Sequence, residues 1–297
     1  MNPASPVSVH PRRIATRLGE LHVRIAGEGP ATVLWPSMFV DGATWDRMLP
    51  LLPGRCLIVV DGPGLGRSDP LTRTSTIAEA ADAATDLLAG LVAHGVIPDG
   101  PVDWVGNAFG GHVGYELAVR PGVLRSFVAV SAPVEPIPAE LRRKIRVLHP
   151  LLRTFGPVGP VRDAILSALL TDASAATPLI RTVVEQSLRR PAKASLSAAL
   201  RSFVLNRLDV SSHLARIGVP ALFVAGSDRG DWTPEQADHA ARRAPNATAV
   251  TISGARTLVP LEQPEALTSA LDAFWTRAGA AQLIGTQAST AATRPSA

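Results

Sequence analysis

The sequence contains one cysteine, few aromatic residues and no long apolar run, and each shortage excludes a class of protein. With Cys56 as the single cysteine of 297 residues, no disulfide and no thiolate metal cluster can form within the chain. Aromatic residues make up 4% of the chain and no nucleic-acid-binding motif is present, so a formal net charge of +4 does not indicate a nucleic-acid partner. No stretch approaches the roughly 18 consecutive apolar residues of a membrane span, and the N-terminus lacks the apolar core of a signal peptide. We therefore expect a cytoplasmic protein that binds neither nucleic acid nor membrane.

The sequence does contain 46% hydrophobic residues, which is typical of a well-packed globular protein. Segments typical of strands and of helices alternate along most of the chain, and this alternation predicts an α/β fold with a mostly parallel sheet flanked by helices. The expected strands are 14–18, 21–25, 32–35, 56–60, 102–105, 126–130, 221–225 and 248–253. The expected helices between them are 43–52, 75–95, 111–119, 235–243 and 264–277.

The alternation stops in one part of the chain, where only helical patterns occur. We expect a loose tail at 1–11, an α/β core formed by 12–137 and 211–279, an all-helical insertion at 138–210, and a disordered tail at 280–297. The helices expected within the insertion are 139–154, 160–171, 176–190 and 193–208.

The residues Gly106-Asn107-Ala108-Phe109-Gly110 have the pattern of a nucleophile elbow without its nucleophile. The usual pattern is Gly-x-Ser-x-Gly, in which the serine occupies a strained turn between a strand and a helix. An apolar strand precedes the pattern here and a helical run follows it, but Ala108 occupies the central position. An alanine cannot attack a carbonyl carbon.

These features together resemble the α/β-hydrolase family over residues 14–278. The segment 61–68, Asp-Gly-Pro-Gly-Leu-Gly-Arg-Ser, is similar to a conserved loop of that family, and 259–265 resembles the segment that follows the catalytic histidine. The insertion at 138–210 falls where the family carries its helical cap. The resemblance implies an α/β-hydrolase fold with an all-helical cap over the pocket.

The departures from this family all concern catalytic residues. The resemblance places Thr257 where the family has its catalytic histidine, and it leaves either Asp228 or Asp231 as the acid. In a serine protease, loss of the nucleophile alone costs about 10⁶-fold in turnover. Losing both Ser and His therefore excludes hydrolysis through an acyl-enzyme.

Other elements of the family's pocket are expected to remain. The oxyanion donors are backbone amides, here those of Met38 and Phe109, and a methyl group at position 108 leaves them in place. The residues expected to line the pocket are Trp35, Ser37, Met38, Ala108, Phe109, Trp232 and Thr257.

Two further side chains are candidates for replacement chemistry. His112 lies four residues beyond Ala108, hence on the same helix face, and either approaches the vacated space or packs against a neighbouring carbonyl. Arg256 either binds an anionic ligand or pairs with Asp228, Asp231 or Glu262. His149 belongs to the insertion and either hangs over the pocket or lies on the surface.

The resulting hypothesis is a repurposed enzyme that carries out lyase, cyclisation, decarboxylation or isomerisation chemistry on a small apolar or weakly acidic organic molecule. Proton transfer or charge stabilisation would come from Asp228 or Asp231, His112 and Arg256. The alternatives are an inactive ligand-binding pseudohydrolase and a weak hydrolase that uses direct water attack. We expect no cofactor and no metal, because the glycine-rich segment 62–66 contains Pro63 and no metal-ligand spacing occurs.

Overall fold

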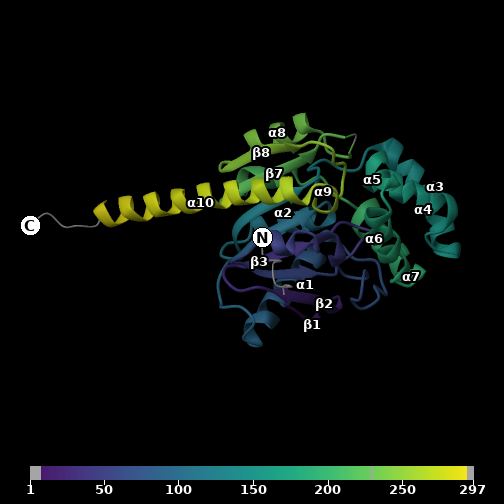
Figure 1. Cartoon of the computed structure of the whole chain (residues 1–297), viewed down its shortest axis with the longest axis horizontal. Coiled ribbons are helices and arrows are strands. Elements are labelled where there is room, and N and C mark those ends of the chain that lie inside the picture. Colours follow the sequence, from purple (N-terminus) through teal and green to yellow (C-terminus); the bar gives the residue numbers. More distant parts are fainter. Residues whose placement is uncertain (1–7, 229, 293–297) are drawn as a thin grey trace, which may run out of the picture.

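A single eight-stranded sheet organises the chain in the computed structural model, which describes residues 8–228 and 230–292 (Figure 1). The strands are β1 (Val9–Thr16), β2 (Gly19–Ala26), β3 (Ala31–Trp35), β4 (Cys56–Val60), β5 (Val102–Asn107), β6 (Leu124–Val130), β7 (Ala221–Gly226) and β8 (Ala247–Ile252). Their order is β1-β2-β4-β3-β5-β6-β7-β8. The strands β3 to β8 are mutually parallel, and β1 and β2 are antiparallel additions at one edge. The predicted mostly parallel α/β fold is therefore confirmed.

Helices cover both faces of this sheet. They are α1 (Ile77–Ala93), α2 (Phe109–Ala118), α8 (Pro234–Arg242), α9 (Val259–Glu262) and α10 (Pro264–Ala292). Successive strand residues point to opposite faces, so Val33 and Phe127 pack with α1, α2 and α8, whereas Leu34 and Val128 pack with α10. Because both faces are buried, the central strands are continuous apolar runs, and this made them predictable.

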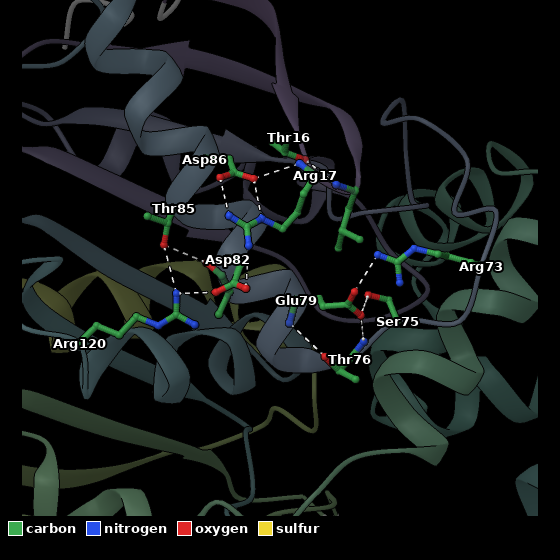
Figure 2. Close-up of polar contacts among 12 residues, drawn as sticks. Thr16, Arg17, Arg73, Ser75, Thr76, Glu79, Asp82, Thr85, Asp86 and Arg120 are labelled. Atoms are coloured by element: carbon green, nitrogen blue, oxygen red, sulfur yellow. Dashed lines mark hydrogen bonds and ion pairs between the residues drawn. The ribbon is translucent and has the colours of Figure 1, made fainter.

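Polar contacts at the N-terminus and along the exposed side of α1 hold it in place (Figure 2). Thr76 and Glu79 form a reciprocal capping box at its N-terminus, where each side chain accepts a hydrogen bond from the other residue's backbone amide. Arg17, next to the end of β1, donates to Asp82 at 2.8 Å and to Asp86 at 2.9 Å on the exposed side of the helix. These half-exposed ion pairs each contribute at most about 1 kcal/mol, so the apolar face of α1 supplies most of its docking energy.

The helices between β6 and β7 gather beside one end of the sheet (Figure 1). They are α3 (Ala139–Phe155), α4 (Gly159–Leu169), α5 (Asp172–Ala176), α6 (Pro178–Arg189), α7 (Lys193–Ala199) and the π-helix η3 (Leu200–Leu205). We call residues 138–210 the helical segment. Its two ends meet at its base, because the backbone N–H of Val210 donates to the carbonyl of Val134 at 2.9 Å.

Three boundaries differ from the sequence predictions. The first strand begins at Val9, within the expected tail 1–11, and residues 1–7 lie outside the described part. Helix α10 continues to Ala292 through residues expected to be disordered, because they are rich in alanine and free of proline, while 293–297 lie outside the described residues. The expected helix 43–52 is instead two short 3-10 helices, Gly42–Trp45 and Leu49–Leu51. None of the described helices combines the length and apolar character needed to cross a membrane.

Candidate functional site

The turn between β5 and α2 keeps the strained backbone of a nucleophile elbow although its central residue is alanine. Ala108 has φ 45° and ψ −101°, a conformation that costs a non-glycine residue on the order of 1–3 kcal/mol. Its amide donates to the carbonyl of Val130 at 2.7 Å. A Cβ on Gly106 would lie 2.1 Å from the carbonyl oxygen of Gly110, so only glycine fits there. The backbone packing of these glycines therefore maintains the elbow without any help from a nucleophile.

A cavity of about 460 Å³ lies between this elbow and the helical segment. Its floor includes Ala108 and the loop 37–39, and its walls come from α3, α4 and η3. The aromatic rings of Phe109 and Phe203 stack across the junction with centroids 4.4 Å apart. Most lining side chains are aliphatic or aromatic, so the cavity suits a molecule with a largely apolar body.

The structure brings most of the expected pocket residues to this cavity. Those that line it are Ser37, Met38, Ala108, Phe109, His112, Asp231 and Thr257. The expectation was wrong for Trp35 and Trp232, which are buried in the core and do not contribute to the lining. Trp35 stacks on Trp104 at 5.3 Å because alternation along β3 turns it into the core, and Trp232 packs against Phe223 at 5.8 Å.

Asp228 and Arg256 form an ion pair with each other, and neither belongs to the described residues that line the cavity. The Arg256 guanidinium donates to the Asp228 carboxylate at 3.2 Å and also to the carbonyl of Ser167 in α4. Both terminal nitrogens of Arg256 are therefore occupied within the protein, and its side chain lies outside the cavity lining. Of the alternatives for Arg256, the structure therefore has the pairing with Asp228, and Asp231 is the acid that reaches the cavity.

His112 lines the cavity, but its ring is also anchored to the protein. Nε2 lies 2.8 Å from the carbonyl oxygen of Pro133 and must donate to it, so the neutral ring carries its lone pair on Nδ1. Burial, reinforced by the positive charge of Arg207, lowers the pKa of His112 to about 4. The ring is thus uncharged at neutral pH and is a weak proton acceptor.

Thr257 joins the core to the helical segment through two hydrogen bonds. Its hydroxyl donates to the carbonyl of Ala168 in α4 at 3.1 Å, and its carbonyl accepts a hydrogen bond from the buried side chain of Asn107 at 2.8 Å. Nearby, the buried carboxylate of Glu262 accepts hydrogen bonds from the backbone amides of Thr171 at 2.8 Å and Arg256 at 2.9 Å. The segment around Thr257 and Glu262 thus holds α4 and α5 against the core.

One imidazole of the helical segment does contact a hydroxyl. Of the two positions considered for His149, the structure has the one over the pocket, since His149 lines the cavity and its Nε2 lies 2.8 Å from Ser197 Oγ. Ser197 is not part of the lining, and among the described residues no carboxylate bonds to the ring. Burial lowers the pKa of His149, and the charges of Arg201 and Arg153 lower it further. The pair therefore lacks the acid that activates a serine nucleophile.

The sequence predictions missed three polar residues of the cavity, Lys144, Ser167 and Arg207, of which Arg207 is the most informative. Its side chain is 7% exposed and donates to Asp231 at 2.7 Å. It lies just past the π-helix η3, and only the sharp turn after η3 directs it inward. No local motif marks such a position in the sequence.

Comparison with known proteins agrees with this architecture. The profile of the Alpha/beta hydrolase family matches residues 32–270. The chain is 30% identical over 259 residues to the "Putative carbamate hydrolase RutD" of Pseudomonas syringae pv. syringae, covering 86% of this chain and 97% of that protein. It is also 30% identical over 263 residues to "Polyketide synthase ThaQ" of Burkholderia thailandensis, covering 84% of this chain but only 12% of that much longer protein. An esterase structure from Thermogutta terrifontis superimposes with a TM-score of 0.77 at 24% identity, over 91% of this chain and 99% of that one.

Proposed function

Because this chain belongs to the alpha/beta hydrolase family, we propose that it binds a small, mainly apolar organic molecule beneath a helical cap and does not attack it through a covalent nucleophile. The cap in this proposal is the helical segment 138–210. The observation that carries the proposal is the strained elbow with alanine at its centre, on the floor of the cavity.

The substitution at the histidine position supports the same conclusion. Thr257 uses its hydroxyl to hold α4, and the two imidazoles of the cavity are committed to Pro133 and Ser197. With neither a nucleophile nor a strong base, an acyl-enzyme would not form at a useful rate. Binding without hydrolytic turnover is therefore the function that the geometry supports best.

A second function is favoured by one observation, the presence of a carboxylate in the cavity. Asp231 lines it together with His112 and Arg207, so a proton could be removed from a bound molecule and the resulting anion stabilised. This would make the protein a non-hydrolytic enzyme that acts through an enolate-like intermediate. Hydrogen–deuterium exchange at the α-carbon of an enolisable aryl ketone tests this function, with D231N expected to abolish any exchange.

The test of the main proposal compares the natural chain with A108S and with the double variant A108S/T257H. Each is incubated with a fluorophosphonate probe and with a p-nitrophenyl ester. We expect no labelling and no turnover above background for the natural chain or for A108S, because a serine without a base is a poor nucleophile. The double variant should gain labelling. Efficient labelling of the natural chain would refute the proposal, and S37A would then show whether Ser37 is the attacking residue.

A further inference from the structure

The side chain of Arg207 is the most unusual polar group at the cavity. Its guanidinium is buried, with 7% of the side chain exposed, and it contributes to the cavity wall beside His112 and Asp231. The other cationic lining residue among those described, Lys144, is 67% exposed and pairs with Glu140 on its own helix. Arg207 is thus the cation that the fold places at the interior of the cavity.

Its hydrogen-bonding capacity is largely unused by the protein. A guanidinium has five N–H donors in a planar fork. One terminal nitrogen of Arg207 donates to Asp231 at 2.7 Å, while Nε, which is fully buried, has no acceptor among residues 8–228 and 230–292. Leaving a buried charged donor without an acceptor is costly. A ligand carboxylate that draws the guanidinium toward the cavity would give this donor an acceptor and recover that free energy.

From this arrangement we infer that the cavity selects an amphiphilic monocarboxylate, a molecule with an apolar chain or ring whose carboxylate pairs with Arg207. The inference rests on the proposed function and names the class of ligand for the same site. A carboxylate matches the planar fork and can bond to two of its N–H groups at once, which a hydroxyl cannot do. The aliphatic side chains of α3 and α4 enclose the apolar part of the molecule.

Asp231 sets the strength of this preference. Its carboxylate competes with the ligand for the same guanidinium and repels a second negative charge. Its side chain is 29% exposed, so solvent screens part of that repulsion. Removing the charge with D231N therefore frees Arg207 and should strengthen carboxylate binding. If Arg207 and Asp231 served only to stabilise the fold, the same substitution would leave ligand binding unchanged or weaken it.

The experiment measures binding of two probes of equal chain length, octanoate and 1-octanol, by calorimetry or ligand-observed NMR near neutral pH. The natural protein should bind octanoate about tenfold or more tightly than 1-octanol, which is the effect of one buried charge-assisted hydrogen bond. R207M should lose that preference and still bind 1-octanol. R201M, which removes an exposed arginine from the π-helix that precedes Arg207, is the matched control and should keep the preference.

The possible outcomes separate this inference from the proposed function. Equal binding of the two probes by the natural protein, or weaker octanoate binding by D231N, would overturn the carboxylate preference while leaving cavity binding intact. If neither probe binds, both the inference and the proposed function are wrong. Should R207M fail to fold, as judged by circular dichroism, the sign of the D231N effect still decides the matter.

Discussion

Burial of the His112 imidazole leads to a prediction about how the free energy of unfolding depends on pH. The pKa of this ring is lowered from 6.5 to about 4, first by burial and then by the charge of Arg207. Below pH 6.5 the unfolded chain takes up a proton that the folded protein does not bind until about pH 4. The free energy of unfolding must therefore fall as the pH falls through this range.

The size of the effect follows from the shift in pKa. Each pKa unit corresponds to 1.36 kcal/mol, so a shift of roughly 2.5 units predicts a loss of about 3 kcal/mol at the acid end of the range. Solvent screens this ring little, because His112 is 3% exposed. At neutral pH the unfolded histidine is also largely uncharged, and the penalty disappears.

The variant H112Q removes the titrating group and keeps an amide donor for the Pro133 carbonyl. Urea unfolding, followed by circular dichroism at steps of pH from neutral to about 4, gives the free energy of unfolding of each protein. We expect the natural protein to lose about 3 kcal/mol more than H112Q across this range. The control H94Q removes an exposed histidine and should follow the natural protein. Parallel pH profiles for H112Q and the natural protein would show that the ring is not desolvated as the structure implies.

Two further substitutions test the contacts that hold the site together. E262A leaves the backbone amides of Thr171 and Arg256 without an acceptor and should reduce the free energy of unfolding by about 2–4 kcal/mol, measured by urea titration. E262Q should lose less, and equal losses for the two variants would mean that the carboxylate is not the acceptor that matters. G106A places a methyl group against the carbonyl of Gly110 and should lower the free energy of unfolding by more than about 3 kcal/mol or prevent folding. The control G218A adds a methyl group that meets no atom within 4 Å and should shift the thermal midpoint little. Similar midpoints for the two variants would contradict the packing argument.

The sequence predicted those parts of the fold that depend on local patterns. Central strands such as β4 and β7 are continuous apolar runs because both of their faces are buried, and the turn at Ala108 carries its glycines at fixed spacing. Pocket residues close to that motif, such as Phe109 and His112, were placed at the cavity for the same reason. Local pattern and tertiary position coincide there.

The remaining predictions required information that a pattern does not contain. The direction of Trp35 depends on the strand register, and the pairing of Arg256 with Asp228 depends on how two loops meet. Arg207 becomes a cavity residue only when the helical segment folds back over the sheet. In each case the deciding contact joins parts of the chain that lie far apart in the sequence. Secondary-structure propensity carries no information about such contacts.

The anchoring of α5 through Glu262 also constrains the order of events during synthesis. Thr171 precedes its acceptor by 91 residues, so at about 5–20 residues per second a ribosome needs roughly 5–20 s to supply that carboxylate. By contrast, Asp41, which pairs with Arg190 of the same segment, is made 149 residues earlier. The growing polypeptide thus carries α5 without this contact throughout that interval, whereas the carboxylate partner of Arg190 is present from the moment Arg190 is made.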